Sequence, residues 1–87
     1  MINIEELKII LGGKVKLNNC KRDIDINIRE IAGKMGCSSI DVLSGLKQLE
    51  SAREIKRLMQ IGWSKDEYTL TVLEKSSILN NLLMNRY

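Results

Sequence analysis

Apolar residues recur at helical spacing in the middle of the chain, and one glycine divides them into two segments. In the first segment the apolar side chains share one face, formed by Ile28, Ile31, Ala32 and Met35. Asn27 suits the N-cap position, because its side-chain oxygen can accept a hydrogen bond from a free amide of the first turn. Gly36 stands where the helix is expected to end through a positive φ angle, which glycine adopts without steric cost.

A second amphipathic segment follows this glycine directly. Ser38 or Ser39 is expected to cap it, and Asp41 falls in its first turn. Its apolar side chains point back toward the preceding helix at 3-4 spacing and are Val42, Leu46 and Leu49. Residues 39–48 are therefore expected to form the exposed helix of the pair. Together the two segments, about 27–52, have the spacing of a helix-turn-helix.

After the helix pair, apolar and polar residues alternate with a period of two, which predicts a β-hairpin over about 54–74. In its first strand Ile55, Met59 and Ile61 are expected to face inward, although Leu58 breaks the alternation. Residues 62–66 supply the turn. The returning strand is rich in strand-forming residue types and alternates threonine with Tyr68, Leu70 and Val72.

The N-terminal part of the chain predicts one helix and one strand. Asn3 and Glu6 form a capping-box pair for a helix over residues 4–11. Gly12-Gly13 is expected to end this helix, because two consecutive glycines cost about 2 kcal/mol relative to alanines in a helix interior. A short strand is expected near residues 23–26, where isoleucine alternates with aspartate.

A C-terminal helix is expected over about 76–86, since apolar residues again recur at helical spacing. Its stripe has more apolar surface than so small a core needs and consists of Ile78, Leu79, Leu82 and Leu83. The stripe either completes the core or pairs with its symmetry mate in a homodimer. We favour the dimer, because Met84 and Tyr87 continue the apolar surface to the end of the chain.

The length of 87 residues predicts one domain, 1–87. The predicted elements give an α+β, mostly helical fold, in which a β-hairpin and an extra C-terminal helix join a three-helix core. A chain of this size is near the limit at which one hydrophobic core suffices, so a dimer interface or a partner often adds stability.

The composition excludes several kinds of chemistry. The chain has no histidine, so imidazole catalysis and histidine ligation are ruled out. Cys20 and Cys37 form no C-x-x-C pair, and free buried thiols in a reducing compartment are the expected state. The chain also has no glycine-rich phosphate loop and no paired-carboxylate motif. We therefore expect no enzymatic activity, no metal and no cofactor.

Charge and hydropathy bear on location and partners. No basic-then-apolar segment opens the chain, and no apolar run approaches the roughly 20 residues of a membrane-spanning helix. We expect a cytoplasmic protein with no membrane partner. The net charge is +3 and the pI about 9.0, with basic residues spread along the chain. Such a balance permits nucleic-acid binding without requiring it.

About half of the chain resembles the winged helix-turn-helix family of bacterial and archaeal transcription regulators. The resemblance runs from Ile28-Arg-Glu-Ile-Ala through Met35-Gly-Cys-Ser and Val42 to Leu46-Lys-Gln-Leu-Glu and Ile55. It implies a sequence-specific regulator that binds double-stranded DNA as a homodimer. In this family the exposed residues of the second motif helix usually read the major groove. Basic residues of the hairpin, called the wing, touch phosphates or the minor groove.

Carried over by position, these roles fall on the exposed helix and on the hairpin. On the helix the residues are Ser38, Ser39, Asp41, Ser44, Lys47 and Gln48. On the wing the residue is Lys65, with Arg57 and Trp63 as weaker candidates. Phosphates can be neutralised by Lys34, Lys47 and Lys65, and the serines and Gln48 can hydrogen-bond to base edges or phosphates. Each lysine is equally compatible with a solvated surface position.

The exposed helix also departs from the family pattern. Ile40, Asp41 and Leu43 stand where DNA readers commonly carry arginine or polar side chains. Ile40, Leu43 and Leu46 form an i, i+3, i+6 row, so part of this face is expected to be buried under the C-terminal helix or against a partner. The alternative function is a winged-helix protein-interaction module, an adaptor or small subunit, whose apolar anchors are Ile40, Leu43 and Trp63.

Trp63, the only tryptophan, falls at the predicted tip of the hairpin. Its ring can contact a sugar, a base or a protein pocket, and it can equally fold back on the hairpin or on the C-terminal helix. The sequence leaves both interpretations open.

Overall fold

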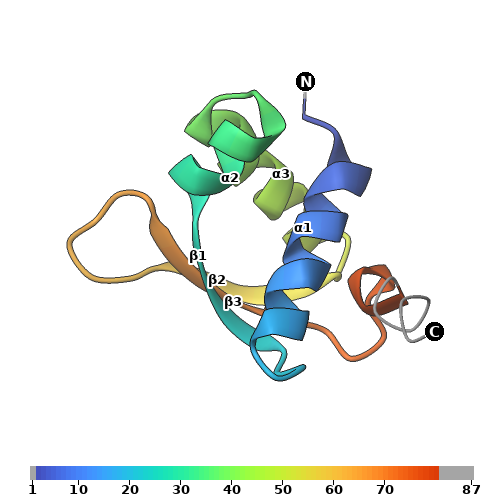
Figure 1. The fold of residues 1–87 in the computed structure, drawn as a ribbon. Helices are drawn as coiled ribbons and strands as arrows, with labels where there is room; N and C mark the ends of the chain where they lie inside the picture. The colour runs from blue at the N-terminus through green and yellow to red at the C-terminus, as the bar shows by residue number, and fades with distance from the viewer. Residues whose placement is uncertain (1, 81–87) are drawn as a thin grey trace.

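The computed structural model describes residues 2–80. Within them the chain forms an α+β fold with three α-helices and a three-stranded antiparallel sheet, and about half of the residues are helical (Figure 1). The predicted α+β class is confirmed. In chain order the elements are α1 (Ile4–Leu17), β1 (Asp23–Asn27), α2 (Ile28–Met35), α3 (Ser39–Ser51), β2 (Ile55–Gln60), β3 (Glu67–Val72) and the 3-10 helix η1 (Ser77–Leu79).

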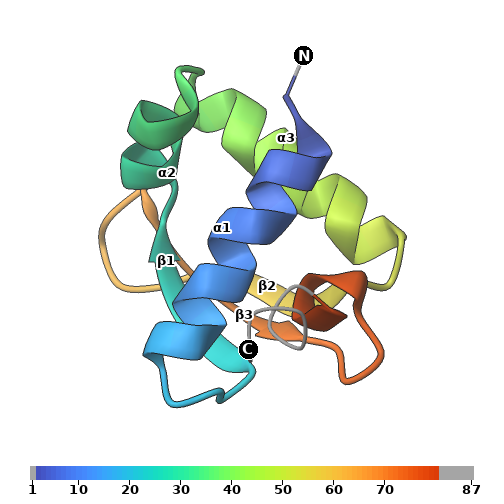
Figure 2. The same ribbon diagram turned by 45° about the vertical axis from the view of Figure 1, so that its right-hand side comes forward.

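The sheet has the strand order β1-β3-β2, so β3 lies in the centre. Ile24 pairs with Leu70 across β1 and β3, and Ile55 pairs with Val72 across β2 and β3. These four residues are buried and pack with the inward faces of the helices. Figure 2 shows α1 in front of the sheet, with its first turns next to α3 and its last turns next to β1.

The two central helices follow the sequence prediction closely. Asn27 is the N-cap of α2, and its side-chain oxygen accepts a hydrogen bond from the Glu30 amide at 3.0 Å. Gly36 ends α2 in the left-handed conformation, with φ 68°. Ser38 then caps α3 and forms a capping box with Asp41. These local hydrogen bonds fix both ends of the turn between the helices.

Replacing Gly36 with alanine is expected to lower the free energy of unfolding by about 1–2 kcal/mol, because the left-handed conformation brings a Cβ close to the following carbonyl oxygen. Gly33→Ala is the matched control within α2. A Cβ at Gly33 would meet no atom within 4 Å, so alanine should raise the stability by about 0.5–1 kcal/mol through helix propensity. Urea unfolding of both variants measures the two changes, and a shift of the same sign in both would contradict the geometry of the turn.

The first helix is longer than the sequence predicts. α1 continues through Gly12 and Gly13 to Leu17, so the expected end at residue 11 is wrong. Gly12 is buried, and a Cβ at this position would lie 3.1 Å from the backbone oxygen of Ile78. The absence of a side chain therefore lets η1 pack closely against α1. Tertiary packing of this kind outweighs the low helix propensity of glycine.

The predicted hairpin is confirmed, but the inward face of its first strand is not. Ile55 is buried as expected, whereas Met59 is 59% exposed and Ile61 is only half-buried, so the inward placement of Met59 is wrong. The register shifts between Lys56 and Met59, and Arg57 has a φ angle of 56°. This irregularity changes which side chains point inward, and Leu58 packs against the core in place of Met59.

The chain after β3 returns to α1. Ser76 caps η1, and Ile78 is fully buried in the core. The burial of Ile78 favours the interpretation in which the apolar stripe completes the core, and Leu79 is partly buried beside it. Of the helix expected over 76–86, the described residues show only the short turn η1, and Leu82 and Leu83 lie outside them.

Candidate nucleic-acid interface

The polar face of α3 points away from the core. Val42, Leu46 and Leu49 are buried against the other elements, which orients the helix. On the opposite side Ser44, Lys47 and Gln48 are exposed, at positions three and four residues apart. At the beginning of the helix Ser38 is exposed, while Ser39 and Asp41 are half-buried. Helical periodicity thus placed Ser44, Lys47 and Gln48 on one accessible face, whereas Ser39 and Asp41 are less accessible than the sequence indicated.

Two of these residues have a structural role at the start of α3. The Ser38 hydroxyl oxygen accepts a hydrogen bond from the Asp41 amide at 3.1 Å, and the Asp41 carboxylate accepts one from the Ser38 amide at 3.4 Å. The capping box accounts for an acidic residue at a position where DNA readers commonly carry basic or polar ones. Ser38 accepts in this contact, so its hydroxyl proton stays free to donate to another acceptor such as a phosphate oxygen.

Lys34, at the end of α2, forms an ion pair with the Glu30 carboxylate. Its ammonium lies 3.7 Å from Glu30, and Lys14 of α1 lies 3.1 Å from the same carboxylate oxygen. The hydrogen bond from Lys14, with the charges of Lys14 and Lys34, lowers the pKa of Glu30. Within residues 2–80 neither Lys47 nor Lys65 forms an ion pair of 4.0 Å or less. Lys47 and Lys65 are therefore better placed than Lys34 to neutralise phosphates.

The β2–β3 hairpin is connected to both central helices by hydrogen bonds. The Leu58 amide donates to the Glu50 carboxylate of α3 at 3.3 Å, and the Ile28 amide of α2 donates to the Asp66 carbonyl oxygen at 2.8 Å. The side chains predicted to contact DNA from the hairpin, Arg57, Trp63 and Lys65, are all exposed. Lys56 is also exposed, and sequence reasoning did not single it out. Its place next to inward-facing Ile55 in an alternating strand was the signal that could have found it.

The apolar row proposed as a protein contact is divided by the fold. Leu46 is fully buried, Leu43 is half-buried against the core, and Ile40 is 80% exposed. Core packing therefore explains two members of the row and leaves Ile40 as an exposed apolar residue. Trp63 is 101% exposed, so within the described part of the chain its ring does not fold back on the hairpin.

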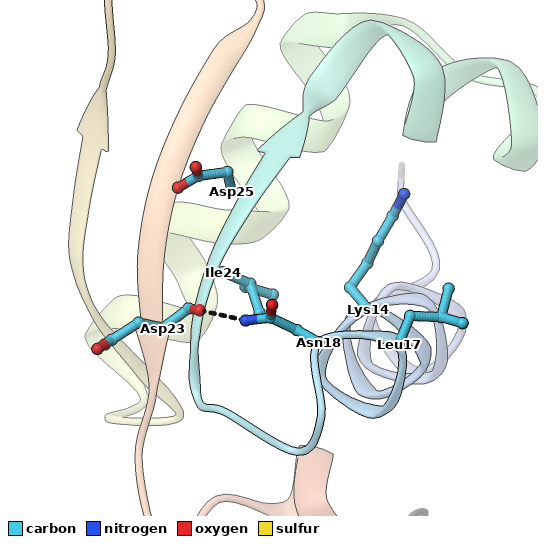
Figure 3. Close-up of a pocket in the computed structure, with 6 residues that line it drawn as sticks. All are labelled: Lys14, Leu17, Asn18, Asp23, Ile24 and Asp25. Carbon is cyan, nitrogen blue, oxygen red and sulfur yellow. Dashed lines mark hydrogen bonds between the residues drawn. The ribbon is translucent and has the colours of Figure 1, made fainter.

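A separate concavity of about 420 Å³ lies between the end of α1 and β1 (Figure 3). The Asn18 side-chain amide donates to the Asp23 carbonyl oxygen at 2.8 Å across this site. None of the residues predicted to contact DNA lines the concavity. It is lined by Lys14, Leu17, Asn18, Asp23, Ile24 and Asp25.

The two cysteine thiols differ in their exposure. Both thiols are free, but Cys20 is exposed and Cys37 half-buried, so the expectation of buried thiols is wrong for Cys20. Across residues 2–80, no three cysteine, aspartate or glutamate side chains are grouped so that they could hold a metal ion. None of the helices in that range is long and apolar enough to cross a membrane.

Comparison of the chain with models of protein families, with curated proteins and with solved structures found no match in any of the three. The family resemblance drawn from the sequence therefore stays a prediction. The case for a function rests on the face of α3, on the hairpin beside it and on their charges.

Proposed function

We propose that this chain is a winged helix-turn-helix protein that binds double-stranded DNA as a sequence-specific transcription regulator. In this proposal α3 enters the major groove, and the β2–β3 hairpin is the wing that contacts the flanking backbone. The observation that carries the proposal is the exposed polar face of α3, with Ser44, Lys47 and Gln48, on a helix joined by hydrogen bonds to a hairpin with exposed cations.

The topology supports the proposal. The element order places three helices and β1 before the β2–β3 hairpin, and β3 pairs with β1 as well as with β2. This order is compatible with the three-helix core and wing that the sequence resemblance predicts. Dimerisation through the C-terminal stripe stays a prediction. Ile78, one residue of this stripe, is buried in the monomer core.

The dimensions and chemistry of α3 suit the major groove. An α-helix with its side chains is about 10–12 Å wide, and the major groove of B-form DNA is about 12 Å wide. Gln48 has the donor and acceptor pair that recognises adenine, and Lys47 can bind a phosphate or the acceptors of guanine. The exposed hydroxyls of Ser38 and Ser44 can donate to phosphate oxygens.

The proposal is tested by the salt dependence of binding to a fluorescently labelled duplex of mixed sequence, measured by anisotropy. We expect the logarithm of the binding constant to fall linearly with the logarithm of the salt concentration. Replacing Lys47 or Lys65 with alanine should reduce this slope by about 0.9 for each phosphate that the variant no longer neutralises. A duplex selected from a random pool should then compete more strongly than the mixed-sequence duplex.

Lys16→Ala is the matched control for these two variants. Lys16 is exposed in the last turn of α1, so the variant loses the same charge at a distance from the polar face of α3. It should leave the salt slope unchanged. Wild-type protein that does not bind the duplex even at low salt would contradict the proposed function.

A protein-interaction module is the second candidate, and the exposure of Ile40 favours it. This apolar side chain is 80% exposed in the first turn of α3, where a DNA-reading helix commonly presents polar groups. A protein partner would bury Ile40 and half-buried Leu43 in an apolar pocket. In that case Ile40→Asp should abolish capture of the partner and leave the folding of the chain intact.

A further inference from the structure

The outer side of α1 carries exposed apolar residues. Ile9 is 60% exposed and Leu17 is 85% exposed, while Leu11 on the opposite side of the helix is fully buried in the core. Ile9, Gly13 and Leu17 follow one another at intervals of four residues, so they form one line along the helix. Figure 2 shows α1 in front of the sheet, and among residues 2–80 no other helix or strand covers this outer side.

Gly13 is not explained by the packing of residues 2–80. It is exposed in the interior of α1, and a Cβ at this position would meet no atom within 4 Å. At neighbouring Gly12, in contrast, a Cβ would lie 3.1 Å from the Ile78 carbonyl oxygen. Glycine lowers the stability of a helix interior, but it allows a second molecule to approach the backbone closely. Gly13 therefore leaves room between Ile9 and Leu17 for a side chain of another molecule.

The charges on the outer side of α1 are complementary to a second copy of the same helix. Glu6 precedes Ile9 by three residues, and Lys16 follows Gly13 by three residues, which places one charge at each end of the line. Both charged side chains are exposed, and within residues 2–80 neither forms an ion pair of 4.0 Å or less. Two antiparallel copies of α1 bring Glu6 of each to Lys16 of the other, whereas parallel copies bring like charges together.

We propose that a second copy of this chain binds to the outer side of α1 in an antiparallel two-fold dimer. The contact surface consists of Glu6, Ile9, Gly13, Lys16 and Leu17. Positions 6 and 16 are centred on position 11, and so are positions 9 and 13, so one two-fold axis at that level forms both pairs. Ile9 of each copy then fills the space beside Gly13 of the other, between two ion pairs.

This surface differs from the C-terminal stripe from which the sequence predicts dimerisation. Ile78 of that stripe is buried in the core, whereas Ile9 and Leu17 are exposed. The inference concerns self-association and does not depend on DNA binding. α1 has 14 residues and is therefore about 21 Å long. Contact through one such helix is smaller than a standard interface of about 800 Å² per partner, so we expect a weak, reversible dimer.

Sedimentation equilibrium of the full chain without DNA tests the dimer, from low-micromolar to near-millimolar protein at low salt. We expect the mean mass to rise with concentration from the 9.9 kDa of one chain toward twice that value. Ile9→Ala should weaken the association by about 10-fold or more, because each substitution removes apolar contacts twice in a two-fold interface. The variant should fold normally, since Ile9 is 60% exposed, and circular dichroism checks this.

An exchange of charges tests the antiparallel arrangement. Lys16→Glu and Glu6→Lys should each weaken the dimer by about 10-fold, because like charges then meet at both ends of the contact. The double variant Glu6→Lys with Lys16→Glu should restore it. Within one helix these two residues lie ten positions apart, about 15 Å, so they do not contact each other in a single chain. Recovery in the double variant therefore reports contact between two copies.

Two variants on other surfaces are the matched controls. Lys65→Glu makes the same change of charge in the loop between β2 and β3, and Ile40→Ala truncates an isoleucine that is 80% exposed on α3. Both should dimerise like the wild type. Loss of the dimer in Ile40→Ala, with no loss in Ile9→Ala, would place the contact on α3 and overturn the inference.

The remaining outcomes are also decisive. A chain that stays monomeric at every concentration overturns the inference, whether residues 81–87 or another protein covers the outer side of α1. A dimer that persists in Ile9→Ala and in both single charge variants overturns it as well, because the dimer then forms through another surface. Neither result affects the regulator proposal. The duplex titrations use protein concentrations at which the weak dimer is dissociated, so Lys16→Ala remains a valid control for the salt slope.

Discussion

Replacement of Leu46 with alanine is expected to lower the free energy of unfolding by about 2–5 kcal/mol. Leu46 is fully buried on α3 and belongs to the core formed by the helices and the sheet. The truncation removes apolar packing and leaves a cavity that its surroundings fill only in part. Small domains have a total stability of about 5–15 kcal/mol, so the decrease is a large share of it. Urea unfolding followed by circular dichroism measures the change.

Ile40→Ala is the matched control on the same helix. Ile40 is 80% exposed, so its truncation should change the stability by no more than about 0.5 kcal/mol. The contrast between the two variants tests which face of α3 packs against the core. Comparable losses of stability at Leu46 and Ile40 would contradict the orientation of α3 and, with it, the exposed polar face on which the proposed function depends.

The helix pair could be predicted from the sequence because its signals are local. The Asn27 cap, the Ser38 capping box and the left-handed Gly36 are determined by hydrogen bonds and backbone angles within a few residues. The burial of Val42 and Leu46 follows from helical periodicity. For the same reason the exposure of Ser44, Lys47 and Gln48 was predictable without knowledge of the neighbouring elements.

The errors occur where distant parts of the chain decide the local structure. Gly12 remains helical because η1, more than sixty residues later in the sequence, packs against it. The exposure of Met59 follows from a change of register against β3, and alternation alone does not show on which side of Leu58 the register shifts. Sequence periodicity carries no information about either arrangement.

The candidate site, like the fold, could be predicted where the signal is local and could not be predicted where distant residues decide it. The accessible side chains of α3 and of the hairpin were found, but their partners were not. The capping role of Asp41 and the pairing of Lys34 with Glu30 have local spacing, but the contact of Lys14 with the same Glu30 carboxylate depends on how α1 packs against α2. Lys47 and Lys65 became the stronger candidates only when these partners were known.

Glu54 joins elements in a way that the sequence did not reveal. This carboxylate lies just before β2, and its side chain is only 17% exposed. It accepts hydrogen bonds from the amide of Ser77, at 3.0 Å, and from the Ser77 hydroxyl, and the Lys8 ammonium of α1 lies 4.0 Å away. Glu54 thus joins α1, the start of β2 and η1, and through η1 it fixes the packing of buried Ile78 against α1.

The pKa of Glu54 links these interactions to pH. Burial by itself would raise the pKa of this carboxyl group, but hydrogen bonds from Ser77 and Ser76 and the charge of Lys8 bring it below its ordinary value of 4.5. In the pH range between the two values the unfolded chain therefore binds more protons at Glu54 than the folded chain does. The stabilisation from Glu54 is complete above about pH 4.5 and is lost as the pH falls through the lowered pKa.

Glu54→Gln is therefore expected to lower the free energy of unfolding by about 1–3 kcal/mol near neutral pH, because the amide group cannot accept both hydrogen bonds from Ser77. The difference from the wild type should shrink as the pH falls below about 4.5, because the unfolded wild-type chain then takes up a proton at Glu54, and it should be smallest once the native carboxylate is protonated as well. Urea unfolding over a series of pH values measures both effects. Glu74→Gln, which changes an exposed carboxylate shortly after β3, should cost no more than about 0.5 kcal/mol at any pH in the series. A difference between Glu54→Gln and the wild type that does not depend on pH would show that the carboxylate charge is not what joins η1 to the start of β2.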